Sequence, residues 1–479
     1  MYRRIFLSLS LAATALCQLD LTSCSSTDLH CIENRISASH ILTELPNFVT
    51  YPIQDDPFYA TPANISQAKP GQILKVEHHT NVSLYDIPPG QSLSRIMYTS
   101  VDNSGQVVPA TAAILWPFTP KPFRNSDKFP LVAWAHGTSG IVRQCAVSIQ
   151  RNLQYDFRAV FTLASMGYAV VLADYVGLGS DQAFNYLAFK LHANDVVYSV
   201  MAAQSAFPQL SKDWVSFGHS EGGGVAWAIG ERQAIRPIPG FLGTIAAAPP
   251  PFPIANTAPV GSSVFTAFLA FTISRLNGLN LTAIFNPVPL QVLQYVQSIG
   301  GCNDAGFAAF GTFTAEDIYS NTSWPLSQEA VDFARDYSVG SRPLGGPMLI
   351  IQGSADTVVI PEGSALGFKN TCASQKNNVS IEYVSVAGQD HNPSLYASQR
   401  IWLQWIEDRF NGVKIKPGCQ HNNLSSPIGN VQLAERFLVE YEKPWITIYS
   451  STFLPESLQA GHLGFVEPNT SAPTTSRSN

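Results

Sequence analysis

The sequence predicts an α/β protein in which a mainly parallel sheet is covered by helices on both faces and carries an inserted helical cap. Apolar, β-branched runs alternate with helical stretches in residues 95–249 and again in 341–412. This alternation is typical of parallel sheets that are buried on both sides. Residues 250–340 interrupt it with apolar segments of helical character. Insertions between core strands often form caps over active sites.

The chain is expected to divide into consecutive parts. Residues 1–17 are a signal peptide, and 18–249 are an N-terminal wrap followed by the first part of the core. Residues 250–340 are the cap, 341–412 are the second part of the core, and 413–479 are an extension whose end is disordered. Strands are expected at 95–101, 107–116, 130–135, 168–173, 214–217, 243–247, 347–352 and 379–386. Helices are expected at 156–165, 191–206, 221–230 and 396–410.

The composition argues against nucleic-acid binding, and the pattern of apolar residues argues against a membrane-spanning helix. The net charge is -6 and charged residues make up 13% of the chain, with no basic run, so nucleic acid is not expected to bind. A membrane-spanning helix is the alternative interpretation of the apolar run 264–285, but a span needs about 20 apolar residues. This run is interrupted by Arg275, Asn277, Gly278 and Asn280.

The N-terminus has the pattern of an export signal. Arg3 and Arg4 precede the apolar run 5–16, and small residues at 15–17 suit cleavage before Gln18. Six cysteines follow the predicted signal, and an even number in an exported chain indicates disulfides. They are Cys24, Cys31, Cys145, Cys302, Cys372 and Cys419. The glycosylation candidates are Asn64, Asn81, Asn280, Asn321, Asn378, Asn423 and Asn469.

Ser220 is the candidate nucleophile. It lies in GHSEG, residues 218–222, between a predicted strand and a helix rich in small residues. A sharp strand-to-helix turn strains the serine backbone and crowds its neighbours, which explains the flanking glycines. The alternative is a glycine-rich packing turn, but the position between strand and helix favours a nucleophile.

A serine hydroxyl needs a base, and the base needs an acid that orients it. His391 lies just after the strand 379–386 and just before the last core helix, whereas His421 and His462 lie beyond that helix. His219, next to the nucleophile, is interpreted as a packing residue. Asp356 follows the strand 347–352 and is the expected acid. The alternative acids are Asp390 and Glu362, and a turn aspartate is the structural alternative for Asp356.

The oxyanion hole needs two backbone N–H donors. One is expected to be Glu221, the residue after the nucleophile. The other is expected in the loop after the strand 130–135, with Thr138 as the candidate. An ordinary turn is the alternative interpretation of this loop.

These segments resemble the secretory lipase family of α/β-hydrolases, the yeast lipase A type and its bacterial relatives. The resemblance covers about residues 45–412. It rests on DPFY at 56–59, PPGQSLSRIMYTSVDNSGQVVPATAAILWP at 88–117, VAWAHGTSGIVRQCAVS at 132–148, VVLADYVGLGS at 170–180, GHSEGGG at 218–224, and the later PMLIIQGSADTVVIP and GQDHNPS. It implies a secreted carboxylic ester hydrolase with a helical lid, a fatty-acyl tunnel and no metal or organic cofactor. Ser220, Asp356 and His391 match the triad positions of the family.

The resemblance also implies disulfides between Cys145 and Cys302 and between Cys372 and Cys419. Cys24 and Cys31 then remain and could close a small N-terminal loop, although six cysteines allow 15 pairings. Relatives often carry Gln or Gly in place of Glu221. An inward-pointing Glu221 side chain would disfavour acidic substrates or products, but we expect it to face outward and to favour the helix N-terminus. The extension 413–479 matches no block of the family.

The leading hypothesis is a lipase or esterase acting on triacylglycerol or medium-chain esters. The alternatives are an esterase for aromatic plant esters, a serine peptidase, and a non-catalytic hydrolase-fold binding protein. The apolar cap favours lipids over peptides, and it is expected to touch lipid surfaces transiently. Phe268 and Phe271 are expected to contact the acyl chain. The protein is expected to be a monomer.

Overall fold

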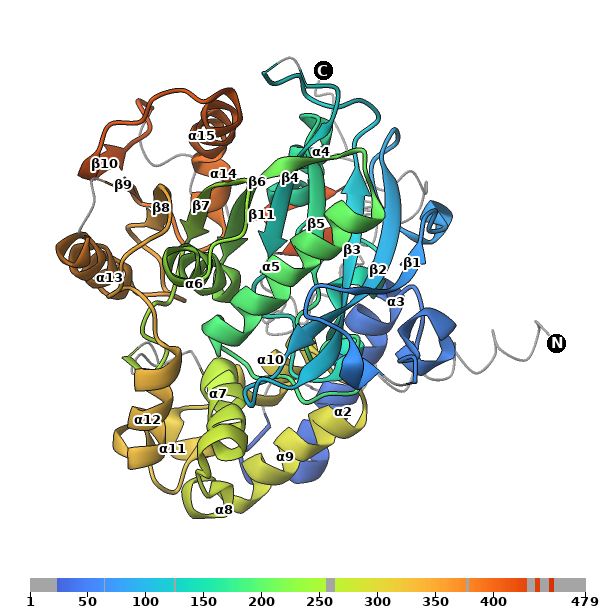
Figure 1. The fold of residues 1–479 in the computed structure, drawn as a ribbon. Coiled ribbons are helices and arrows are strands. Elements are labelled where there is room, and N and C mark those ends of the chain that lie inside the picture. Colours follow the sequence, from blue (N-terminus) through green and yellow to red (C-terminus); the bar gives the residue numbers. More distant parts are fainter. Residues whose placement is uncertain are drawn as a thin grey trace, which may run out of the picture.

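The computed structural model describes residues 24–63, 65–124, 126–255, 263–375, 379–428, 436–439 and 448–451 (Figure 1). The predicted signal peptide, His462 and the sequons at Asn64, Asn378 and Asn469 lie outside the described residues.

A ten-stranded mixed sheet forms the centre of the molecule, with strand order β1-β2-β3-β5-β4-β6-β7-β8-β9-β10. The first pairs, up to β3 with β5, are antiparallel, and all pairs from β5 to β10 are parallel. The strands are β1 Ile73–Glu77, β2 Ser92–Val101, β3 Val107–Trp116, β4 Phe129–Ala135, β5 Ala169–Ala173, β6 Leu210–His219, β7 Phe241–Ala247, β8 Met348–Gly353, β9 Ser380–Val386 and β10 Gly418–Leu424. Two short antiparallel strands, β11 Arg436–Val439 and β12 Ile448–Ser451, form a second sheet.

Helices cover both faces of the main sheet, as predicted. On one face α5 and α6 pack against alternate strand residues such as Ala133 and Val171, in one hydrophobic cluster. On the other face α4 and α15 pack against the intervening residues, such as Trp134 and Phe217. The core helices are α4 Val160–Ser165, α5 Phe189–Ala206, α6 Glu221–Ile235, α13 Pro361–Ser374, α14 Pro393–Ala397 and α15 Gln399–Asn411.

Between β7 and β8 the described chain is helical and contains no strand. These helices are α7 Ser263–Asn277, α8 Leu281–Ile284, α9 Pro287–Ser298, α10 Asn303–Phe310, α11 Ala315–Ile318 and α12 Gln328–Tyr337. They gather at one end of the molecule, below the sheet in Figure 1. The predicted apolar run is split because α7 ends before Gly278, which has a φ of 86°. None of the described helices is both long and apolar enough to cross a bilayer.

The N-terminal segment contains helices that the sequence analysis missed. These are α2 Leu29–Ser39 and α3 Leu45–Asn47, joined by a short π-helical turn. Helix α2 packs against α9 and α10, and its residues Ile32 and Ile36 are fully buried. The wrap is therefore part of the hydrophobic core beneath the inserted helices.

Three disulfides tie these parts together. Cys145 is bonded to Cys302 and Cys372 to Cys419, the two pairs that the resemblance implies, and the remaining Cys24 is bonded to Cys31. Cys145–Cys302 joins the loop after β4 to the start of α10, and Cys372–Cys419 joins α13 to the edge strand β10. In both cases the bond links a core element to a peripheral one.

Candidate active site

Ser220 occupies the turn between β6 and α6. Its φ of 61° and ψ of -126° lie in a region that non-glycine residues rarely adopt, and its side chain precedes the first turn of α6. The two flanking glycines are needed because there is no space for a side chain at either position. A Cβ atom at Gly218 would lie 2.0 Å from the carbonyl oxygen of Gly222, and one at Gly222 would lie 1.9 Å from that of Ala135. The turn therefore holds Ser220 at the N-terminus of a helix, where negative charge is favoured.

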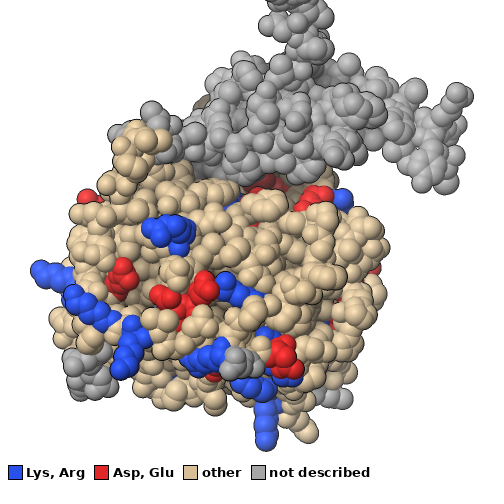
Figure 2. Space-filling view, turned by 90° about the horizontal axis from the view of Figure 1, so that it is seen from above, with Lys and Arg blue, Asp and Glu red and all other residues tan. Residues whose placement is uncertain are grey.

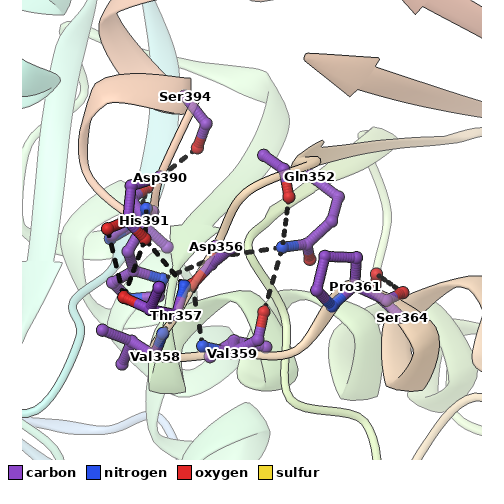
Figure 3. Close-up of polar contacts among 12 residues, drawn as sticks. Gln352, Asp356, Thr357, Val358, Val359, Pro361, Ser364, Asp390, His391 and Ser394 are labelled. Atoms are coloured by element: carbon purple, nitrogen blue, oxygen red, sulfur yellow. Dashed lines mark hydrogen bonds and ion pairs between the residues drawn. The ribbon is translucent and has the colours of Figure 1, made fainter. Parts of the chain in front are cut away.

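His391 and Asp356 come together from the loops after β9 and β8. His391 Nδ1 lies 2.9 Å from Asp356 Oδ2, and both residues are 4% exposed (Figure 3). Asp356 Oδ1 accepts hydrogen bonds from the backbone N–H groups of Val358 and Val359 at 2.9 and 2.8 Å. The carboxylate is thus fixed on both oxygens, and His391 keeps its Nε2 for other partners.

Gln352, which the sequence analysis did not single out, also contacts Asp356. Its Nε2 donates to Asp356 Oδ2 at 2.9 Å and also contacts the Val359 carbonyl at 3.2 Å. It lies near the end of β8, where no motif distinguishes it from other strand residues. Its hydrogen bond to Asp356 becomes evident only in the folded structure.

The alternative acids lie elsewhere. Asp390 Oδ1 accepts from the backbone N–H groups of Thr357 and His391, both at 2.8 Å, so it braces the loop that carries Asp356 (Figure 3). Glu362 is exposed in the first turn of α13. His421 is exposed on β10, where its ring lies 5.0 Å from that of Tyr383.

The loop after β4 lies directly against Ser220. A Cβ atom at Gly137 would lie 3.1 Å from Ser220 Cβ. The Gly137 N–H donates to Tyr155 Oη at 3.1 Å, so it is occupied. The next N–H group, that of Thr138, makes no hydrogen bond within the described structure and remains the candidate second oxyanion donor beside that of Glu221.

His219 is buried behind His391. Its Nδ1 lies 3.0 Å from Tyr155 Oη, and its Nε2 lies 3.2 Å from the carbonyl oxygen of His391. Burial, with the neighbouring His391 next in importance, holds the pKa of His219 well below its usual value. A neutral His219 therefore bridges Tyr155 and the His391 backbone, in keeping with the packing role expected of it.

The outward orientation expected for Glu221 is wrong. The residue is 1% exposed, and its Oε1 accepts from the Leu187 N–H at 3.1 Å and lies 3.6 Å from His192 Nε2. Helix α5 and the loop before it cover this side of α6, so the side chain cannot reach solvent. Burial raises the pKa of Glu221 to about 7.

Two cavities meet at Ser220. One, of about 420 Å³, is lined mainly by apolar residues, including Leu187 and Pro250, and by Leu269 of α7. The other, of about 570 Å³, is lined by His391, by polar residues such as Gln154 and Asn303, and by Phe307. Within the described structure, Ser220 Oγ makes no direct hydrogen bond to His391. In enzymes without bound substrate, hydrogen bonds between catalytic groups are often long and shorten only when the substrate binds.

The inserted helices reach the apolar cavity through residues other than those predicted. Phe265, Thr266 and Leu269 of α7 line it. Phe268 is fully buried and packs against Tyr186, and Phe271 also lies outside the lining. The prediction of Phe268 and Phe271 is wrong because the cavity contacts one face of α7, and helical periodicity directs these two side chains away from that face.

The described glycosylation candidates lie on the surface of the molecule. Asn81, Asn280, Asn321 and Asn423 are exposed. In the described part of the chain, no three His, Cys, Asp or Glu side chains gather as a metal site. On the face shown in Figure 2, acidic and basic side chains are interspersed rather than gathered into one patch.

No protein-family model matches the chain. Lipase 10 of Candida albicans is 22% identical over 417 residues, which cover 79% of this chain and 85% of that protein. Lipase 4 of the same organism is 25% identical over 409 residues, which cover 78% and 84%.

Solved structures show the same fold. Candida antarctica lipase A in its closed state matches with a TM-score of 0.65 and 16% identity, covering 80% of this chain and 92% of that chain. The rice cell wall degrading esterase LipA from Xanthomonas oryzae matches with a TM-score of 0.56 and 18% identity, covering 72% and 97%. These matches confirm the α/β-hydrolase fold and the resemblance to lipases of the yeast lipase A type, and with the sequence relatives they support a carboxylic ester hydrolase.

Proposed function

We propose that the protein is a secreted serine hydrolase that cleaves acyl esters, a lipase or esterase for triacylglycerol or medium-chain esters, through Ser220, His391 and Asp356. The observation that carries the proposal is the convergence of a strained serine and a carboxylate-held histidine on one cavity. Ser220 comes from the β6–α6 turn and His391 from the loop after β9.

In the proposed mechanism, Ser220 Oγ attacks the ester carbonyl while His391 Nε2 takes its proton. Asp356 keeps the other ring nitrogen, Nδ1, protonated and stabilises the imidazolium. The N–H groups of Glu221 and Thr138 donate to the developing oxyanion. His391 then returns the proton to the leaving alkoxide, and water releases the acid from the acyl-enzyme by the same route.

The apolar cavity next to Ser220 supports an acyl substrate, because each buried CH₂ contributes about 0.8 kcal/mol. Similarity to proteins named lipases supports the same substrate class. Secretion is supported by the three disulfides and by the basic and apolar pattern of residues 3–16.

Variants of the triad test the mechanism. Ser220→Ala should lose nearly all ester hydrolysis, and Asp356→Asn should lose about four orders of magnitude in kcat, as expected when the imidazole adopts the wrong tautomer. Asp390→Asn is the matched control, since it neutralises a nearby carboxylate whose Oδ1 accepts from the backbone N–H groups of Thr357 and His391. If Asp390→Asn is crippled and Asp356→Asn is active, the acid is misassigned.

The substrate class is tested with p-nitrophenyl and glyceryl esters of acetate, octanoate and palmitate, beside feruloyl esters and a peptide panel. We expect kcat/KM to rise from acetate to octanoate, and we expect peptides to be inert. Preferred cleavage of feruloyl esters or peptides would replace the lipase hypothesis by one of its alternatives.

A further inference from the structure

The two cavities that meet at Ser220 differ in chemistry. The first presents mostly carbon, from proline, leucine, valine and phenylalanine side chains. The second is richer in polar side chains, which include those of Gln154, Arg158, Asn303, Asp304 and Asn392, and it also contacts Phe265, Phe307 and Val358. An ester bound at Ser220 extends in two directions, so its acyl part and its alcohol part meet different surfaces.

The position of His391 decides which part enters which cavity. His391 lines the polar cavity and is absent from the lining of the apolar one. Its Nδ1 is held by Asp356, so the proton for the leaving alkoxide must come from Nε2. That transfer requires the leaving oxygen within hydrogen-bond reach of Nε2. The alcohol therefore extends into the polar cavity and the acyl chain into the apolar one.

The polar cavity offers both donors and acceptors. Gln154 Oε1 and Asn303 Oδ1 have no partner within the described structure, and buried polar atoms of this kind usually have one. Arg158 is a cation whose guanidinium stacks 4.9 Å from the Tyr155 ring centroid, and its Nε lies 3.6 Å from Asp156 Oδ1. A hydroxyl group both donates and accepts, so it can satisfy the amide oxygens and the guanidinium alike.

Asp304 also lines the cavity, and its carboxyl interacts with Glu44 and Thr43. Burial, with the carboxylate of Glu44 next in importance, raises the pKa of Asp304 well above its usual range. Asp304 therefore adds little negative charge near neutral pH, and the amide and guanidinium groups of the cavity suit a hydroxyl-rich group.

We propose that the cavity lined by Gln154, Arg158 and Asn303 is the alcohol subsite and that it selects monoesters of small polyhydroxylated alcohols over esters of apolar or fully acylated alcohols. The inference rests on the proposed function, which it deepens by naming the leaving group. Among the substrates of the proposed function, it ranks monoesters above triacylglycerol, whose leaving alcohol carries two apolar chains.

Three water-soluble butyrate esters test the subsite while keeping the acyl group constant: glyceryl monobutyrate, propyl butyrate and tributyrin below its solubility limit. Propanol is glycerol without two of its hydroxyls, so the pair isolates their contribution. We expect kcat/KM for the glyceryl monoester to exceed that for propyl butyrate about tenfold, the effect of one or two hydrogen bonds. We also expect it to exceed that for tributyrin per ester bond.

Asn303→Leu and Gln154→Leu should reduce the glyceryl-to-propyl ratio severalfold, because each removes an amide that only the glyceryl hydroxyls can use. Gln154 Nε2 also donates to the Thr138 carbonyl at 2.8 Å, so its variant is judged by the ratio, in which a loss common to both esters cancels. Leu269→Ala is the control on the apolar side and should leave that ratio intact. A wild-type ratio near one, or equal losses for both esters in the leucine variants, would overturn the alcohol subsite. Absence of Ser220-dependent hydrolysis of any ester would instead overturn the proposed function, so the two failures are distinguishable.

Discussion

The buried carboxyl of Glu221 makes the stability of the fold depend on pH. Its pKa is raised from 4.5 to about 7, chiefly because burial desolvates the charged form. The titratable groups around it are His192 of α5, which favours the charged form, and the hydroxyls of Tyr155, Tyr175 and Tyr186. The basic partner among these groups is His192, whose Nε2 lies 3.6 Å from Glu221 Oε1.

The folded state binds this proton more tightly than the unfolded state does. The stabilisation is therefore fully present below pH 4.5 and is lost as the pH rises through about 7. A rise in pKa of this size corresponds to roughly 3 kcal/mol, at ~1.4 kcal/mol per unit. Glu221→Gln keeps the shape of the side chain but cannot ionise, so this part of the pH dependence should disappear.

Urea unfolding near pH 4.5 and near pH 8 measures the effect. Between the two conditions the wild type should lose roughly 3 kcal/mol more of its unfolding free energy than Glu221→Gln, since titrations that are independent of Glu221 cancel in the difference. Glu362→Gln is the control, because Glu362 is exposed, and it should follow the wild type. The reasoning fails if wild type and Glu221→Gln show the same pH dependence.

Three further outcomes are expected. Gly222→Ala should reduce kcat more than 100-fold or prevent folding, because the added methyl lies 1.9 Å from the Ala135 carbonyl oxygen; near-normal kinetics would show that the turn is not crowded. Replacing Cys145 and Cys302 by serine should lower the unfolding free energy in urea by about 3–5 kcal/mol, since the bond closes a long loop, and an unchanged midpoint would contradict this. Leu269→Asp should impair octanoate esters more than acetate esters, because it places a charge in the apolar cavity; equal losses would mean that the cavity does not hold the acyl chain.

The sequence was most informative where chemistry restricts both residue type and position. The order of serine, acid and histidine, each after a strand, led to Ser220, Asp356 and His391, and the structure brings the last two into contact. Strands with buried, β-branched residues, such as β3 and β9, were predicted because their composition is dictated by the core.

Elements at the periphery were missed for a physical reason. Strand β10 reads GCQHNNL and is mostly exposed at the sheet edge, so it has no hydrophobic pattern. Helix α2 is short, and its only strong sequence signal is Asp28, which caps it by accepting from the Cys31 N–H.

The orientation of the Glu221 side chain could not be predicted from the sequence either. An acidic residue in the first turn of a helix normally favours solvent. Its burial depends on Leu187 and His192, which come from a different part of the chain and are placed only by the packing of α5 on α6. Side-chain direction at such a position is a property of tertiary contacts.

The most direct test of the proposed mechanism is the site of covalent labelling by a fluorophosphonate, which reacts with activated serine nucleophiles. After incubation of the purified protein with the probe, intact mass and peptide mapping should show one label per chain, on Ser220, with ester hydrolysis lost in proportion to labelling. Prior mutation of His391 to Ala should abolish labelling, because the serine then lacks its base. Label on another residue, or full hydrolytic activity in a chain labelled at Ser220, would contradict the assignment of Ser220 as the nucleophile.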